Sequence, residues 1–215
     1  MHRIAVNSVL GRMRKAIRER ERILAVAENT LQPVATGDDD ELRDLSAPAI
    51  AEDVDMTLDA AAEGNVVISN ISGSITVSGW SRSQVEVTGT LGRNVEKLIF
   101  ERDGDEITIK VKVPGSGGRG FDSDLDITTE SAGADKGGRL DVETVNGSVD
   151  IEFSGDVSAR FDIDVFNGEI RSCFGPEAER TSKYLPGWQL EFTMGSGDGR
   201  VDISTVNGDV SICSD

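Results

Sequence analysis

Histidine is almost absent from this chain, because the single one among 215 residues is His2, next to the N-terminus. The rest of the chain therefore cannot build a Ser-His-Asp triad, a Cys-His nucleophile or the usual His-containing zinc site. Cysteine is nearly as rare: only Cys173 and Cys213 occur, and two cysteines alone cannot complete a zinc site. We therefore predict no catalytic residue, no metal site of this kind and no cofactor.

Long hydrophobic runs are missing as well. No stretch of eighteen apolar residues occurs, so the sequence predicts no integral membrane segment. Residues 46–51, SAPAIA, match the small-residue pattern at which a secretory signal is cut, but the apolar core that should precede such a site is absent. This combination predicts an aberrant signal region rather than an intact signal peptide.

Positive charge is scarce except at the N-terminus. The formal net charge is -17, yet residues 1–22 carry seven Lys and Arg against two Glu, a net of +5 that leaves -22 for the remainder. Apolar residues recur there at near-helical spacing, which predicts a basic amphipathic helix that binds a membrane surface or a partner, or else a solvated leader. The acidic remainder should repel nucleic acid and attract cationic partners or divalent cations.

A compositional change marks a domain boundary near residue 51. Residues 31–51 contain Pro33, Pro48 and the acidic run DDDE, which is typical of a linker. Beyond it, apolar residues alternate with polar ones at a period of two, the pattern of half-buried strands. We predict a basic leader with an acidic linker over residues 1–51 and an all-β, strand-repeat domain over residues 52–215.

A repeated phrase dominates this second part. It reads LDVETVNGSVDI from Leu140, FDIDVFNGEIRS from Phe161 and VDISTVNGDVSI from Val201, with a fainter copy, VVISNISGSITV, from Val66. Asn-Gly between alternating runs is a strong hairpin signal, which favours an antiparallel β-sandwich. The repeat glycines, however, are 21 and 40 residues apart, close to one and two turns of a coil. We therefore prefer a β-solenoid with Asn-Gly corners and laddered Asn side chains, and keep the sandwich as the alternative.

Stacking of these copies would align chemically similar residues. Six residues before each repeat glycine stand Asp141, Asp162 and Asp202, and neighbouring carboxylates at strand spacing attract cations. The alternatives for this ladder are a divalent-cation site and a solvated face. Cys173 and Cys213 also share one phase of the repeat, so a disulfide forms if residues 174–187 loop out. It cannot form if residues 188–194 make a rung between them.

Longer phrases resemble a known family. NVVISNISGSITVSGWSRSQVEVTG from Asn65, EKLIFERDGDEITIKVKVP from Glu96, the three Asn-Gly phrases and FGPEAERTSKYLPGWQLEFTMGSGDGRVDISTVNGDV from Phe174 are similar to the bacterial putative-adhesin family of β-strand-repeat domains of unknown function. The resemblance covers residues 53–215. It implies a β-solenoid-like domain exported behind a signal peptide, without established catalytic residues, and it suggests that residues 1–45 are not part of the working protein.

These observations lead to one preferred function and two alternatives. We expect a non-catalytic interaction module of the periplasm or cell envelope, adhesin-like, whose partner is an envelope protein or a polysaccharide. Carboxylate-only catalysis keeps open a carbohydrate-active enzyme on a β-helix. The basic N-terminal segment keeps open a cytoplasmic scaffold tethered through that helix.

Overall fold

The protein is all-β wherever its structure is described. The computed structural model describes residues 51–214, apart from residues 62, 80–81, 115–121, 130–136 and 183–185. The all-β prediction is confirmed, and the described part contains no helix that could span a bilayer. The predicted basic helix, the linker and the SAPAI portion of the cleavage-like motif lie outside the described residues.

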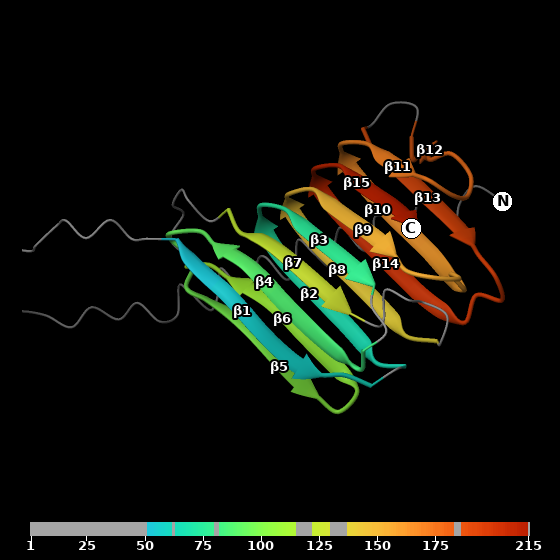
Figure 1. The fold of residues 1–215 in the computed structure, drawn as a ribbon. Coiled ribbons are helices and arrows are strands. Elements are labelled where there is room, and N and C mark those ends of the chain that lie inside the picture. The colour runs from blue at the N-terminus through green and yellow to red at the C-terminus, as the bar shows by residue number, and fades with distance from the viewer. Residues whose placement is uncertain are drawn as a thin grey trace, which may run out of the picture. The chain divides into compact units, whose positions relative to one another are not determined.

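Two sheets face each other across one core (Figure 1). The seven-stranded sheet has the order β1 (Glu52–Asp59), β4 (Gln84–Leu91), β7 (Asp124–Thr129), β3 (Ile75–Gly79), β9 (Val149–Phe153), β15 (Val210–Ser214) and β11 (Ile170–Ser172). The eight-stranded sheet has the order β12 (Glu179–Arg180), β13 (Trp188–Thr193), β10 (Ala159–Asn167), β14 (Gly199–Asn207), β8 (Arg139–Asn146), β2 (Asn65–Ser72), β6 (Glu106–Lys112) and β5 (Lys97–Asp103).

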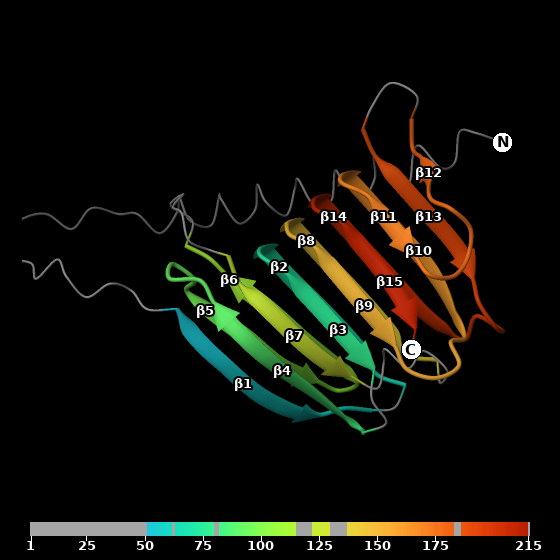
Figure 2. The same cartoon turned by 45° about the horizontal axis from the view of Figure 1, so that its top comes forward.

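Both sheets are mixed. Their central strands are parallel, from β10 to β6 in one sheet and from β11 to β7 in the other, whereas β1, β4, β5 and β13 pair antiparallel at the ends. The repeats stack in parallel in the middle of each sheet, and antiparallel strands flank them at three of the four sheet ends, the exception being the parallel edge strand β11 (Figure 2). The sheets therefore match neither the predicted solenoid nor the antiparallel sandwich in full.

The Asn-Gly pairs are corners between the sheets and not hairpin turns within one sheet. Each repeat runs along the eight-stranded sheet, turns at its corner and continues in the seven-stranded sheet, and we call such a strand pair a rung. The corner residues Asn167, Asn207, Asn146 and Ser72 lie in register on neighbouring rungs. The predicted amide ladder is confirmed, since Asn167 Nδ2 donates to Asn207 Oδ1 at 2.9 Å and Asn207 Nδ2 donates to Asn146 Oδ1 at 2.7 Å.

The order of the rungs in space differs from their order in the sequence. The prediction from repeat spacing, that repeats 21 residues apart stack on each other, is therefore wrong. Rung β10/β11 follows β8/β9 in the chain, 21 residues on, yet the two rungs are not neighbours. Rung β14/β15, which comes last, lies between them and pairs with both. After β10/β11 the chain forms β13, which pairs antiparallel with β10 on the side away from β8. The chain then forms β14/β15, which lies between β8/β9 and β10/β11.

The core lies between the inner faces of the two sheets, where alternating residues such as Ile68, Ile109, Val142 and Ile151 are buried. This is the result expected for half-buried strands, because successive side chains point to opposite faces. At the other end of the core from β1, four phenylalanines pack together: Phe153, Phe161, Phe174 and Phe192. Strand β1 itself carries four acids, and such charges on an edge strand oppose pairing with a second copy.

Candidate functional site

The outer face of the eight-stranded sheet carries the predicted row of acids. Strands β10, β14 and β8 are parallel neighbours, and their register sets Asp162 beside Asp202 and Asp202 beside Asp141. A second row of polar residues lies two positions further along the same strands and consists of Asp164, Ser204 and Glu143. The stacking thus brings together the three aspartates that the repeat pattern singled out.

A row of arginines accompanies these acids. Arg160, Arg200 and Arg139 are neighbours in the same register, two residues before the aspartates and therefore on the same face. The sequence shows them as RFD, RVD and RLD, a signal that reasoning from the acids alone missed. The face is therefore an alternation of positive and negative rows rather than a purely acidic ladder.

Ion pairs connect the two rows. Arg200 binds Asp202 with two nitrogens, Nε at 2.6 Å and Nη2 at 2.9 Å. Arg139 Nη2 lies 2.9 Å from an oxygen of Asp141 and 3.1 Å from one of Asp202, so it bridges two rungs. The side chain of Asp202 is only 10% exposed, so these contacts partly replace the water that a carboxylate needs.

The electrostatics of Arg200 reflect this arrangement. The hydrogen bonds and the charge of Asp202 raise the pKa of the Arg200 guanidinium above its usual range, and the charges of Asp162 and Asp141 add to the effect.

Within the described residues, no group of three or more metal-ligating side chains is placed to hold a metal ion. The cation affinity of the ladder stays a prediction, and the arginines weaken it because they supply the countercharge.

Removing both arginines is expected to raise the affinity of the ladder for calcium above that of the unmodified protein. In the R139Q/R200Q variant the aspartates lose their countercharge, and carboxylates about 4.8 Å apart on neighbouring strands attract a divalent cation. Calorimetric titration and melting with calcium chloride measure the effect. The K112Q/R171Q variant is the matched control, since it loses the same charge from the exposed pairs with Glu96 and Glu169. Calcium binding by the unmodified protein would instead support a site at the intact ladder.

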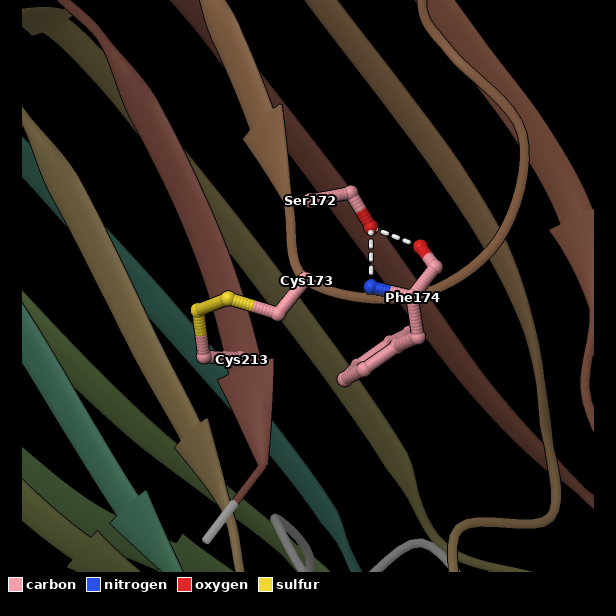
Figure 3. Close-up of a disulfide and its surroundings, with 4 residues drawn as sticks. All are labelled: Ser172, Cys173, Phe174 and Cys213. Atoms are coloured by element: carbon pink, nitrogen blue, oxygen red, sulfur yellow. Dashed lines mark hydrogen bonds between the residues drawn. A yellow bond between two sulfur atoms is a disulfide. The ribbon is translucent and has the colours of Figure 1, made fainter.

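The two cysteines form a disulfide on the outer side of the seven-stranded sheet (Figure 3). Cys173 follows β11 and Cys213 lies in β15, the strand that pairs with β11, and their Cα atoms are 4.9 Å apart. Residues 188–193 do form a strand, β13, but it pairs with β10 on the side away from β14. It therefore does not lie between the cysteines, and the disulfide forms although these residues are a strand.

The disulfide adjoins the aromatic end of the core. Phe174 directly follows Cys173, and its backbone N–H donates to the hydroxyl of Ser172 at 3.2 Å (Figure 3). The Phe174 ring packs against Phe161 and Phe192 with centroid distances of 5.7 and 6.0 Å. The cross-link thus fixes the start of the segment that closes this end of the core.

A comparison with protein-family models decides the family. The model of the Toastrack DUF4097 family matches residues 8–213. The chain belongs to this Toastrack family. The match confirms the resemblance to adhesin-like β-strand-repeat domains of unknown function. It also begins 45 residues earlier than the resemblance did, and so includes most of the basic segment.

Solved structures similar to this Toastrack chain are distant. A putative cell adhesion protein from Clostridium sporogenes is 11% identical, with 76% of this chain and all of that chain covered and a TM-score of 0.37. A putative lipid binding protein from Parabacteroides distasonis, also 11% identical, has a TM-score of 0.39, with 76% and 60% covered. A putative adhesin from Parabacteroides merdae is 9% identical, with 77% and 58% covered and a TM-score of 0.34. No curated protein matches the Toastrack sequence.

The Toastrack domain also has a shallow surface depression beside β4 and the start of β7. Thr90, Arg93, Asp122 and Asp124 are among its lining residues. The hydroxyl of Ser74 donates to Asp124 Oδ1 at 2.6 Å and the Ser74 backbone N–H donates to it at 3.0 Å. These two hydrogen bonds lower the pKa of Asp124 below its usual range, and the bond from the Ser74 hydroxyl has the larger effect. The acid therefore stays ionised at neutral pH.

Proposed function

We propose that this Toastrack chain is a non-catalytic, adhesin-like interaction module of the bacterial cell envelope, built on a β-solenoid-like stack of rungs. It works in the periplasm or at the cell surface and presents a regular outer face to an envelope protein or a polysaccharide. The exposed arginines Arg139, Arg160 and Arg200 offer such a partner positive charges at a fixed spacing, set by neighbouring strands.

The disulfide is the observation that carries this proposal. Cys173 and Cys213 are joined, and they are the two cysteines of the whole chain. Protein disulfides persist in oxidising compartments such as the periplasm and the cell surface, and they are rare in the reducing cytosol. A chain whose complete cysteine content is paired is thus better suited to the envelope than to a cytoplasmic scaffold.

The state of the acids supports the non-catalytic part of the proposal. Hydrolysis by paired carboxylates needs one acid that keeps its proton near the working pH. Asp141 and Asp202 are instead occupied by ion pairs with Arg139 and Arg200. Ser74 lowers the pKa of Asp124, and Ser196, followed by Ser158, lowers that of Asp198. Asp124 and Asp198 are therefore unsuited to donate a proton near neutral pH.

Thiol trapping in the native cells tests the compartment. Free thiols are alkylated before lysis, the cells are fractionated, and the intact mass of the protein is measured with and without subsequent reduction. We expect the protein in the periplasmic or surface fraction, with both cysteines protected from alkylation until a reductant is added. A known cytosolic cysteine protein in the same sample shows that the trapping worked.

Two results would contradict the proposal. One is alkylation of both cysteines before reduction, and the other is recovery of the protein with the cytosolic fraction. The C173S/C213S variant provides the control for non-specific alkylation. Activity on a polysaccharide that survives in this variant and disappears when the ladder aspartates are replaced would favour the enzyme instead.

A further inference from the structure

The three Asn-Gly pairs have the same sequence and the same position on their rungs. Asn167, Asn207 and Asn146 lie in register, and all three side chains are exposed. Gly168 and Gly208 also share their backbone geometry, with φ angles of 152° and 151°. Gly168 and Gly208 therefore differ at their corners chiefly in hydrogen bonding, and Gly147, which lies outside this φ region, is compared with them by the bond of its N–H.

The backbone N–H of the glycine is bonded in two of the three corners. Gly208 N–H donates to Asn167 O at 2.9 Å, and Gly147 N–H donates to Asn207 O at 2.8 Å. Each of these bonds reaches to the next rung toward β10. Rung β10/β11 is the last of the parallel stack in that direction, so the corresponding donor of Gly168 has no rung to bind.

Nothing else in the described part of the chain replaces that missing rung. Strand β13 lies beyond β10, but its pairing stops where Trp188 meets Val165, two residues before Asn167. No described residue accepts a hydrogen bond from Gly168 N–H. The side chain of Asn167 is also less restrained, because its Nδ2 donates to Asn207, whereas Asn207 both donates and accepts along the ladder.

We propose that Asn167-Gly168 is a site of spontaneous deamidation, and that the ladder protects the other two Asn-Gly pairs. In this reaction the deprotonated nitrogen of Gly168 attacks Cγ of Asn167. A C–N bond forms to give a succinimide ring, the bond from Cγ to Nδ2 breaks, and the side-chain nitrogen leaves as ammonia. Water then opens the ring to aspartate or isoaspartate, and no oxidant, reductant or cofactor takes part.

The hydrogen bond of the glycine determines which pair reacts. A backbone N–H that donates to a carbonyl must lose that bond before its nitrogen can be deprotonated and turned toward Cγ. Gly147 and Gly208 therefore react only when their corners open, and such openings are rare within a packed sheet. The N–H of Gly168 needs no opening. The product at residue 167 also lacks the Nδ2 that donates to Asn207, so deamidation removes the last bond of the ladder and adds a negative charge there.

Peptide mapping after incubation of the folded full chain at mildly alkaline pH tests the proposal. Mass spectrometry measures the fraction of aspartate plus isoaspartate at each of the three positions over time. We expect Asn167 to convert at least about tenfold faster than Asn146 or Asn207, which corresponds to about 1.4 kcal/mol of local protection. The same incubation in denaturant should bring the three rates close together, because all three residues precede glycine.

Single variants show how much of the total ammonia release comes from Asn167. The N167S variant should release ammonia several times more slowly than the unmodified protein, whereas N146S should leave the rate nearly unchanged. Conversion of Asn146 or Asn207 as fast as Asn167 in the folded chain would overturn the proposal. An advantage of Asn167 that persists unchanged in denaturant would overturn it too, because the cause would then be local sequence and not the fold.

Discussion

Replacing Gly147 by alanine is expected to destabilise the domain by about 3 kcal/mol or more, a cost at the upper end of what overpacking causes. A Cβ added at Gly147 would lie 1.8 Å from the carbonyl oxygen of Gly73 on the next rung. That oxygen belongs to the backbone, and the N–H of the same residue, Gly73, donates to Asn146 O at 3.0 Å. Gly73 therefore cannot move away without weakening the backbone hydrogen bond between the two rungs. For a domain of this size the melting temperature should fall by roughly 6–12 °C.

Gly104 offers the matched control for this prediction. It has a φ of 60°, which disfavours alanine, but an added Cβ would meet no atom within 4 Å. The G104A variant should therefore lose only the backbone term, about 1–2 kcal/mol. Chemical denaturation of both variants compares the two costs. Gly147 does not lie in the left-handed region, so equal losses would show that the close approach of the rungs costs no more than the unfavourable φ of Gly104.

Loss of the disulfide is the second large effect. The C173S/C213S variant should be less stable by about 2–4 kcal/mol, because the bridge closes a long loop and restricts the unfolded chain. The two cysteines are 40 residues apart in sequence, and the loop between them contains β12, β13, all of β14 and the start of β15. The loss should also loosen the segment around Phe174, which depends on the cross-link for its position at the end of the core.

Reduction of the unmodified protein provides the comparison. Thermal melts with and without reductant should differ for the unmodified protein and coincide for the double variant. Hydrogen exchange should locate the change at β11 and residues 174–180 rather than at β1 or β4. A double variant as stable as the oxidised protein would contradict the expectation, and so would exchange that increases evenly over both sheets.

Local pattern predicted much of this fold. Alternating residues such as Val66, Ile68, Ile107 and Ile109 identified strands and their buried faces correctly, because a half-buried strand must place every second side chain in the core. The repeated Asn-Gly predicted a ladder of amides, which the bonds among Asn146, Asn167 and Asn207 confirm. These features depend on neighbouring residues, so the sequence contains enough information for them.

The order of the rungs could not be predicted in the same way. The repeats at Gly147, Gly168 and Gly208 share one Asn-Gly phrase, and that phrase does not say which two of them are neighbours. Which two become neighbours depends on the path of residues 174–198, and periodicity contains no information about that path. The arginines of the ladder were a different case, since Arg139, Arg160 and Arg200 stand at fixed spacing and could have been read with the acids.

The position of β14/β15 has a consequence for how the protein is made. In a simple repeat protein each new repeat can dock on the one synthesised before it. Here β8/β9 and β10/β11 can complete their pairing only with β14/β15, which comes later in the chain than either of them. A nascent chain that has not reached Gly199 exposes unpaired edges in the middle of both sheets, where aggregation begins easily. Synthesis of the last two strands, and not stepwise growth, therefore determines when the stack can close.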